Sequence, residues 1–414
     1  MRLLRIYLCC LGCCFAADPA QLDQLIAEAL ANNREILAAQ KRVEAARQRS
    51  SPARGLPDPL LSVGYASNGG PLPGQGLGSN PTSNIGVTIS QEFTSRDKRR
   101  LRGDIAVKEA DAAFQDYQSV QLSVRSRISQ AYHRLHHTWE ALEILEEGRR
   151  VLSDVIHFSE ARYTAGKTPQ QDIFKAQMQL SLMETRIIKM QQDQQTAEAE
   201  INTLLNRTPG TPVGQPVEGE IFPLLLTVDE LLAKAAATAP ELRRDVAFIQ
   251  RDELGVNLAR RELRPDYTIA AGYFNQGGMP PMVQFRVEVP LRLHTESRQR
   301  PMINEKVDQL SESRRNFEAA EQSLQFRVRE AYLAAQTAWK LWQLYNDTIL
   351  PQTQLTVEAS LNAYQTGATD LAGVLTNIAA KTDVQEQLHE QGLNFALAVA
   401  RLEEMTGIEL RGSR

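Results

Sequence analysis

Cysteine is missing from all but the first fourteen residues of this chain. Its four cysteines are Cys9, Cys10, Cys13 and Cys14. They fall within residues 1–17, where Arg2 and Arg5 precede an apolar run and small residues follow it. A charged start, an apolar centre and a small-residue end are typical of a secretory signal peptide. Its removal would exclude disulfides and thiol chemistry from the mature chain, which we expect to function outside the cytoplasm.

A second interpretation of this N-terminal segment is processing as a lipoprotein, with lipid attached to Cys13 after Leu11-Gly12. Cys10 stands where such a signal usually carries an aliphatic residue. We therefore expect cleavage after Ala16 or Ala17 and keep lipidation of Cys13 as the alternative.

Long apolar runs and aromatic side chains are also scarce. Beyond the signal, no stretch approaches the ~20 apolar residues of a membrane-spanning helix, so the chain would have to cross a membrane with strands. Aromatic residues make up 6% of the chain, and its helical stretches are rich in Ala, Gln, Glu and Arg, which favours long helices over compact cores. Without Arg2 and Arg5 the chain carries 44 basic and 50 acidic side chains, and this balance does not indicate a nucleic-acid partner.

The sequence further lacks the motifs of catalysis and cofactor binding. It contains no nucleophile with a matching base, no Gly-rich phosphate loop and no Cys/His cluster. Its many Asp and Glu residues fall on the expected exposed faces of helices. We therefore expect neither an enzyme nor a bound cofactor.

What the chain does contain is an internal repeat. Three pairs of segments match in the same order: Leu56–Tyr65 with Arg264–Tyr273, Ala131-Tyr132 with Ala331-Tyr332, and Tyr163-x-x-Gly166 with Tyr364-x-x-Gly367. A tandem duplication is the simplest explanation. We predict a first repeat over residues 18–207, a linker over 208–227 and a second repeat over 228–410.

Hydrophobic period and helix breakers predict the same order of elements in both repeats, namely helix, strand, strand, helix, helix. In the first repeat the predicted helices cover 22–54, 96–163 and 170–206, and the strands cover 58–67 and 84–93. In the second repeat the helices cover 228–262, 296–364 and 371–406, and the strands cover 266–274 and 282–291.

The predicted strands alternate in character with period two. In the last strand one face carries Val283, Phe285, Val287, Val289 and Leu291, and the residues between them are mostly polar. An apolar outside and a polar inside in segments of ~9–10 residues are the signature of a transmembrane β-barrel. An ordinary half-buried sheet, which alternates in the same way, is the alternative. Four strands cannot close such a barrel, so several copies of the chain would have to contribute.

The two longest predicted helices favour the barrel. About 68 residues at ~1.5 Å rise extend for ~100 Å, which is longer than a compact domain uses. Their apolar positions keep a seven-residue period in the same phase: Ile128, Ala131, Leu135, Thr138, Leu142 and Leu145, then Val328, Ala331, Ala335, Ala338, Trp342 and Tyr345. Many of these residues are small, so neighbouring helices can approach closely, as a closed cylinder of coiled coils requires. Pro351 should kink the second of these helices.

The signal peptide, the duplicated helix-strand-strand-helix-helix halves and the paired Tyr-x-x-Gly turns together resemble the outer-membrane efflux proteins of the TolC family. Within that family, the compact length and the Pro-Asp-hydrophobic strand starts are similar to the cobalt-zinc-cadmium type of outer-membrane component. The resemblance covers essentially the whole mature chain. It implies a mainly α homotrimer in the cell outer membrane, whose twelve-stranded β-barrel continues into a long periplasmic coiled-coil α-barrel. It also implies contact with outer-membrane lipid and two protein partners, a periplasmic adaptor and an inner-membrane efflux pump.

The same resemblance assigns a role to the turns that end the long helices. It implies that Tyr163, Gly166, Tyr364 and Gly367 form the periplasmic tip, where the adaptor docks and the pore closes. Whatever the function, glycine is the usual residue just past the C-terminus of a helix, because it accepts positive φ.

Two aspartates near these turns are further candidates. Asp172 stands where family members commonly carry a tip carboxylate, whereas in the second repeat Gly373 holds the equivalent place and Asp370 comes three residues earlier. A threefold ring of either aspartate would attract cations. The alternative is that each carboxylate stabilises the start of its own helix.

His133, His136 and His137 lie at i, i+3 and i+4 of a long helix, so pairs of them share a face that suits a metal. Because the sequence offers no evident carboxylate or fourth ligand beside them, solvent-facing histidines are the favoured interpretation.

We therefore expect the outer-membrane channel of a tripartite export system, driven by a resistance-nodulation-division pump that expels heavy-metal cations. Two alternatives stay open. One is the same channel with drugs, small organic molecules or polypeptides as cargo, and the other is a periplasmic coiled-coil scaffold whose strands form a small sheet.

Overall fold

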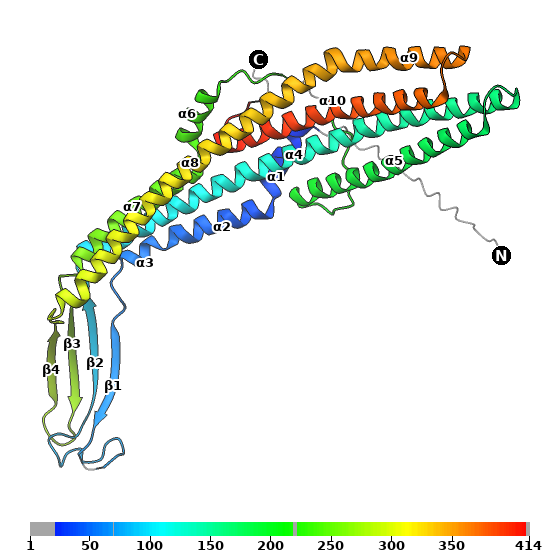
Figure 1. The fold of residues 1–414 in the computed structure, drawn as a ribbon. Helices are drawn as coiled ribbons and strands as arrows, with labels where there is room; N and C mark the ends of the chain where they lie inside the picture. The colour runs from blue at the N-terminus through cyan, green and yellow to red at the C-terminus, as the bar shows by residue number, and fades with distance from the viewer. Residues whose placement is uncertain (1–20, 69, 218–221, 411–414) are drawn as a thin grey trace, which may run out of the picture. The chain divides into compact units, whose positions relative to one another are not determined.

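The computed structural model describes residues 21–68, 70–217 and 222–410 (Figure 1). The predicted signal peptide and Cys13 lie outside these residues. The first repeat contains α1 (Leu22–Asn32), α2 (Arg34–Gln48), α3 (Ser50–Arg54), β1 (Leu60–Ala66), β2 (Asn84–Phe93), α4 (Arg96–Thr164) and α5 (Gln170–Leu204). The second contains α6 (Val228–Thr238), α7 (Pro240–Arg261), β3 (Tyr267–Asn275), β4 (Met282–Glu288), α8 (Arg300–Leu344), α9 (Leu350–Thr366) and α10 (Leu371–Thr406). The predicted order of elements is confirmed in both halves.

Each repeat begins with broken helices, where the sequence predicted continuous ones over 22–54 and 228–262. Two of the breaks fall at Asn33 and Ala239, whose ψ angles of 129° and 118° are not helical, and another, at Arg49, separates α2 from α3. The Asn33 side chain accepts hydrogen bonds from the backbone N–H of Glu35 and Ile36 and so caps α2. Ala239 precedes Pro240, and a residue before proline is disfavoured in the α conformation.

The chain divides into two compact units, each of which combines segments of both repeats. Unit 1 is Met1–Leu37, Val120–Ala239 and Leu324–Arg414, and unit 2 is Ala38–Ser119 and Pro240–Ser323. The units therefore do not follow the predicted repeat boundaries, which stay a prediction.

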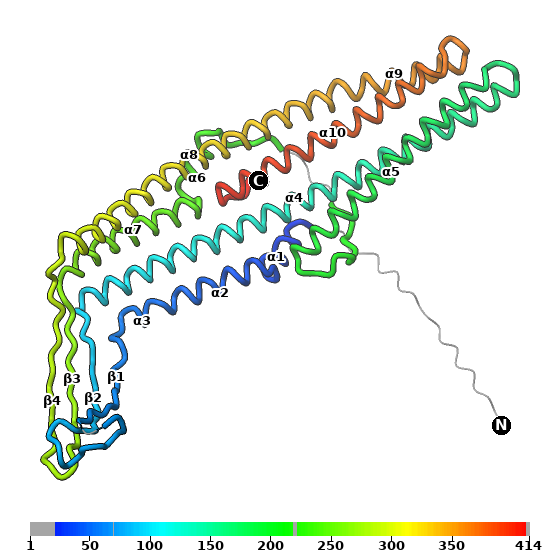
Figure 2. The backbone as a smooth tube through the Cα atoms, turned by 60° about the horizontal axis from the view of Figure 1, so that its bottom comes forward, coloured from blue at the N-terminus to red at the C-terminus, as the bar shows by residue number. Residues whose placement is uncertain are grey.

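Unit 2 contains one antiparallel sheet in the order β1-β2-β3-β4, whose strands run side by side in Figures 1 and 2. One row of partners across it is Val63, Val87, Tyr273 and Val283. Apolar side chains on this face are exposed, with Val63 at 73% and Val283 at 74%. The opposite face is formed mostly by small and polar residues, as the period of two predicts, but it also carries Leu60, Phe274 and Met282.

β4 is shorter than the strand predicted over 282–291. It ends at Glu288, so Val289 and Leu291 lie beyond it, although both side chains are exposed. Pro290 follows in this segment, and proline has no N–H to donate to a neighbouring strand.

Unit 1 contains the predicted seven-residue seam. Ile128, Ala131, Leu135 and Thr138 are buried in α4, and Val328, Ala331, Ala335 and Ala338 are buried in α8. The seam is thus confirmed at these positions, with alanine dominating in the second repeat, whereas Leu142, Trp342 and Tyr345 are only half-buried. None of the helices among the described residues is both long and apolar enough to cross a membrane.

Two π-helical turns occur in the long helical segment of the second repeat as the structure describes it, one directly before α8 and one between α8 and α9. They cover Thr295–Gln299 and Tyr345–Ile349, and each is followed within two residues by a proline, Pro301 or Pro351. In the second, the Leu350 N–H donates to the carbonyl oxygen of Tyr345, five residues back. A wider turn suits a proline, because proline cannot donate to the carbonyl four residues back and its ring crowds that group.

Candidate functional site

The first candidate site is the turn between α4 and α5, in unit 1. Gly166 has φ +70°, and its N–H donates to the carbonyl oxygen of Tyr163 at 2.9 Å. The next N–H, of Lys167, donates to the Arg162 carbonyl oxygen, also at 2.9 Å. This pair of bonds is a Schellman motif, which uses the glycine to satisfy carbonyls left over at the helix end. The Tyr163 side chain is 44% exposed.

The turn between α9 and α10 repeats this geometry. Gly367 has φ +82° and donates to Tyr364, while Ala368 donates to the carbonyl oxygen of Ala363 at 2.8 Å. The tyrosine differs, because Tyr364 is only 4% exposed. The two turns thus share the same backbone hydrogen bonds, but Tyr163 is exposed and Tyr364 is buried.

The two aspartates take different positions at the helix starts. Asp370 is the N-cap of α10, and its Oδ1 accepts from the backbone N–H of Gly373 at 3.1 Å. Asp172 lies in the first turn of α5, and its Oδ2 accepts from the Thr168 hydroxyl at 3.3 Å. Each carboxylate therefore lies at the N-terminus of its own helix, where a negative charge is stabilising. This local role is enough to explain the position of both side chains.

An arginine that sequence reasoning missed joins the two turns. Nη1 of Arg162, near the end of α4, donates to the carbonyl oxygens of Tyr364 at 2.7 Å and Gln365 at 3.3 Å, near the end of α9. Its guanidinium carbon lies 5.0 Å from the centre of the Tyr364 ring, within cation–π range. A positive charge at a helix C-terminus also favours the helix dipole. We call this set of contacts the Arg162 clamp.

The buried Tyr364 ring completes the contact between the hairpins. Its hydroxyl lies 3.2 Å from the buried Ser159 Oγ, and its ring packs edge-on against Phe158 at 5.7 Å. Beneath it, α4, α5, α9 and α10 share a hydrophobic core whose buried members include Leu152, Val155, Ile187, Leu371 and Ile378. Figure 2 shows the two hairpin turns at the same end of these helices.

The three candidate histidines do not converge on one point. His136 lies 3.5 Å from Oε2 of Glu140, and that same oxygen is 2.6 Å from Nδ1 of His389 on α10. Sequence reasoning missed Glu140, although it lies one helical turn after His136. Among the described residues, no group of three or more His, Cys, Asp or Glu side chains is placed to hold a metal ion.

The surroundings shift two pKa values in this cluster. Burial alone raises the pKa of Glu140, but the hydrogen bond with His389 and the charges of His389 and His136 outweigh it, so the pKa lies below its usual value. Burial, followed by the charge of His389, lowers the pKa of His137. The neutral form of His137 is thus favoured beside an ionised Glu140.

At the end of the sheet in unit 2, a buried ion pair ties β3 to the start of α4. The Lys98 side chain is 1% exposed, and its Nζ donates to Oδ2 of Asp266 at 2.9 Å and to the carbonyl oxygen of Arg264 at 2.6 Å. The backbone N–H of Ser95 donates to the other Asp266 oxygen at 3.1 Å. Asp266 belongs to the repeated Pro-Asp motif, so this motif anchors the strand start to the following helix.

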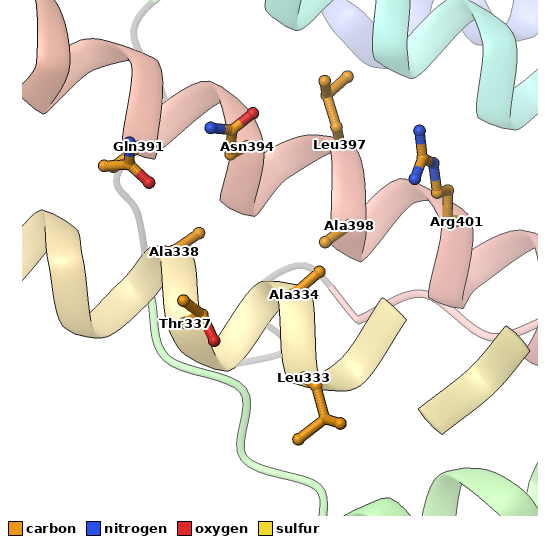
Figure 3. A pocket seen from close by; sticks show the side chains of 9 residues that line it. All are labelled: Leu333, Ala334, Thr337, Ala338, Gln391, Asn394, Leu397, Ala398 and Arg401. Carbon is orange, nitrogen blue, oxygen red and sulfur yellow. The ribbon is translucent and has the colours of Figure 1, made fainter. Parts of the chain in front are cut away.

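A groove between α8 and α10 has a volume of about 440 Å³. Figure 3 shows Ala338 and Ala398 between the two helices, while Leu333 points away from α10. The groove is lined mainly by alanines, leucines and amides, with Arg401 at one end. It holds no pair of groups suited to acid–base or nucleophilic chemistry.

Comparison with known proteins finds a sequence family that part of the chain matches. Residues 25–207 match the family model of the outer membrane efflux proteins. The chain is 25% identical over 264 residues to the probable outer membrane lipoprotein SilC of Salmonella typhimurium, an alignment that covers 62% of this chain and 56% of SilC. It is 24% identical over 395 residues to the pyoverdine export outer membrane protein OpmQ of Pseudomonas putida, covering 89% of this chain and 81% of OpmQ.

The fold is similar to that of CusC, crystallised to follow the conformational changes that accompany folding and transmembrane channel formation. The two structures superpose with a TM-score of 0.78 over 94% of this chain and 93% of CusC, at 17% identity. At this level of identity the likeness shows the fold alone.

Proposed function

We propose that the chain is an outer membrane efflux protein and forms the exit duct of a tripartite efflux system, because residues 25–207 match that family model and two relatives named as outer membrane proteins align with it. It lies in the outer membrane and extends into the periplasm. Its family and fold are those of channels. In the proposed role it conducts passively and takes its cargo from a resistance-nodulation-division pump in the inner membrane, through a periplasmic adaptor.

The sheet of unit 2 is the observation that carries this proposal. Phe285 and Val287 are 74% and 60% exposed on one face, and Gln284 and Arg286 alternate with them. An exposed apolar face is costly in water and is stabilised by lipid. In the proposed role Val283, Phe285, Val287, Val289 and Leu291 contact the hydrocarbon of the outer membrane.

A single chain does not complete the proposed channel. Within the described sheet, β1 and β4 each have a partner strand on one side only. Bacterial barrels of this type need at least about eight strands. We infer a homotrimer, in which three four-stranded sheets form a twelve-stranded barrel.

The hairpin turns are the proposed periplasmic tip. Tyr163, Gly166 and Asp172 on one hairpin, and Tyr364, Gly367 and Asp370 on the other, would dock the adaptor and close the pore. The Arg162 clamp supports this role, because it holds two separate hairpins together through a few contacts that an adaptor can replace.

Two cargo classes are supported by different observations. The Pro-Asp strand starts resemble the cobalt-zinc-cadmium type of channel and favour heavy-metal cations, our first choice. The name of OpmQ assigns it to pyoverdine export and favours a small organic molecule.

Tolerance of metals and drugs tests the function directly. An efflux-deficient host would carry this chain with its own adaptor and pump, and the control strain would lack only this chain. Loss of zinc, cobalt, cadmium or copper tolerance in the control would support metal export, whereas loss of drug or siderophore export would favour organic cargo. Equal tolerance of every compound in both strains would contradict the proposal.

The lipid-facing assignment has its own test. We expect Val287→Asp to reduce the amount of protein in the outer membrane, because a charge on the lipid face costs up to about 2–4 kcal/mol at mid-depth. Gln284→Asp, on the opposite face of the same strand, is the matched control and should insert normally. Equal yields of both variants in outer-membrane fractions would show that the faces are assigned wrongly.

Lipid attachment at Cys13 remains the alternative to cleavage after Ala16 or Ala17, and SilC is itself named a lipoprotein. The mass of the N-terminal peptide from membrane-extracted protein distinguishes the two.

Expression of residues 18–207 and 228–410 as separate chains would test the proposed repeat boundaries.

A further inference from the structure

The two outer strands of the sheet present complementary open edges. β1 pairs only with β2, and β4 pairs only with β3, within the sheet that the structure describes. An open edge exposes unpaired backbone N–H and C=O groups, which readily pair with another strand. The exposed apolar residues on β1 include Leu61 at 66% and Val63 at 73%, and those on β4 include Phe285 and Val287. Both edges are therefore suited to a strand with an apolar outer face.

The internal repeat indicates which strand would fit each open edge. β1 and β2 belong to the first repeat, and β3 and β4 to the second, so the contact of β2 with β3 joins one repeat to the next. If copies of the chain follow one another around a closed barrel, the contact of β4 with β1 of the next copy joins repeats in the same way. The observed β2–β3 pairing is thus the template for the missing pair.

The pairing within each repeat identifies equivalent residues. Leu61 lies opposite Ile89, and Ile269 lies opposite Val287. The matched Pro-Asp segments place Leu61 and Ile269 at equivalent positions, and Val63 and Ala271 likewise. Ile89 and Val287 are therefore equivalent as well.

The template then specifies a register. Ile89 lies opposite Ala271 in the β2–β3 pair. Val287 is equivalent to Ile89, and Val63 is equivalent to Ala271. We propose that β4 pairs antiparallel with β1 of a neighbouring copy so that Val287 lies opposite Val63, with Phe285 opposite Tyr65 and Val289 opposite Leu61. This inference rests on the proposed trimer and names the contact that closes it.

This register explains the residues beyond the end of β4. In the isolated chain Val289 is exposed and outside the strand. In the proposed pair it continues the outward apolar row beside Leu61 of the next copy. β2, which has a neighbour on both sides, runs on to Phe93, and the Phe93 ring stacks on Tyr267 of β3 at 5.4 Å.

An ion pair at the end of the strands is inferred from the motifs that follow them. Asp266 binds the buried Lys98, whereas its counterpart Asp58 is exposed and has no hydrogen bond or ion pair among the described residues. The sequence Ser95-x-x-Lys98 after β2 recurs after β4 as Thr295-x-x-Arg298. These motifs lie 200 residues apart, whereas Ile89 and Val287 lie 198 residues apart, so the second repeat has two more residues between strand and motif. The Arg298 side chain is also exposed and lacks such a partner in the described chain. Arg298 of one copy therefore binds Asp58 of the next.

Cysteine cross-linking tests the register. The described residues contain no cysteine, and directly opposed strand residues have Cα atoms about 4.5–5.5 Å apart, which suits a disulfide. The variant with Val63→Cys and Val287→Cys should form covalent oligomers on oxidation in outer-membrane fractions, as seen on non-reducing gels. Val63→Cys with Phe285→Cys, or with Val289→Cys, keeps the same face but shifts the register by two residues. These pairs should cross-link at least tenfold less, and each single substitution controls for the N-terminal cysteines.

Charge exchange tests the ion pair independently. Asp58→Arg alone and Arg298→Asp alone should each lower the temperature at which the oligomer dissociates in detergent, and the double exchange should recover at least half of the loss. Asp58→Arg combined with Arg300→Asp is the matched control and should not recover it, because Arg300 already pairs with Glu296 at 2.8 Å.

The outcomes separate this inference from the proposed function. Preferential cross-linking of a shifted pair, equal cross-linking of all pairs, or no cross-linking in trimers that still support tolerance would overturn the register alone. Single charge exchanges without effect, or a double exchange without recovery, would overturn the ion pair. Absence of trimers and of tolerance in the unsubstituted protein would instead contradict the proposed function.

Discussion

The two hairpins of unit 1 end in the same turn but bury different side chains. Gly166 and Gly367 have φ values of +70° and +82° and close the same pair of backbone hydrogen bonds. Yet Tyr163 is 44% exposed and Tyr364 is 4% exposed. The repeated motif therefore determines the backbone of the turn, whereas the neighbouring segment determines whether the tyrosine of the motif is buried or exposed.

The difference begins with the residue before each tyrosine. The first repeat has Arg162 there, and the second has Ala363. Arg162 reaches across to the end of α9, where the Tyr364 ring packs inward against Phe158. The two similar turns thus form unlike halves of one contact, with the cation on one hairpin and the aromatic ring and carbonyl acceptors on the other.

Removing each tyrosine should give the largest difference between the hairpins. We expect Tyr364→Ala to lower the free energy of unfolding by about 3–5 kcal/mol, because it empties a buried aromatic site. Tyr163→Ala should change it by no more than about 0.5 kcal/mol, since that side chain is largely exposed. Urea denaturation in detergent, followed by helical circular dichroism, measures both. Similar losses in the two variants would mean that the environments are not distinct.

Removing the clamp should have the next largest effect. We expect Arg162→Ala to lower the free energy of unfolding by about 1.5–3 kcal/mol, the range for hydrogen bonds made by a charged group. Arg162→Lys keeps the charge but not the planar guanidinium, so it should recover only part of the loss.

The same variants test the proposed gate. If the clamp holds the tip closed, Arg162→Ala should raise the conductance of the reconstituted protein, and Arg207→Ala, which removes an ion pair with Glu28 away from the tip, should not. Equal conductance of the Arg162→Ala variant and the unsubstituted protein would count against a closing role for Arg162.

Replacing the turn glycines should affect both hairpins alike. Gly166→Ala and Gly367→Ala each force a Cβ into the left-handed region, at about 1–2 kcal/mol. No atom lies within 3.4 Å of a Cβ at either position, so conformational strain is the only expected cost. Thermal denaturation of the two variants should give shifts of similar size, and a large inequality would show that one turn carries an additional contact.

Removing the aspartates should give the smallest difference. Asp370→Ala removes an N-cap and should cost about 1 kcal/mol, whereas Asp172→Ala removes a first-turn charge, worth about 0.3–1 kcal/mol. Asp370→Asn retains a capping oxygen and is the control. A strong loss of transport in Asp172→Ala without a change in thermal stability would instead favour a cation-attracting role for Asp172.

Several errors in the predicted elements have signals in the sequence itself. The break at Ala239 precedes Pro240, the break at Asn33 is at a residue that caps the next helix, and the early end of β4 precedes Pro290. The period of two in the strands and of seven in the long helices predicted the order of the elements and their buried faces, because each depends only on spacing along one element. It did not indicate the π-helical turns on either side of α8.

The elements of the candidate site could be predicted only in part. The turns at Gly166 and Gly367 were evident, because a glycine past a helix end is a local requirement. Nothing near Arg162 in the sequence indicates that its partners are carbonyls some two hundred residues away. The same holds for His389, which shares Glu140 with His136 across 249 residues of sequence.

Local chemistry along the chain was therefore enough to predict the order of helices and strands, the seams and the glycine turns, since each follows from the period or backbone freedom of neighbouring residues. Packing between distant segments settled which tyrosine is buried, which cation joins the hairpins and which aspartate binds Lys98. These outcomes depend on which side chains meet across elements, and the spacing of residues within one element carries no information about that meeting.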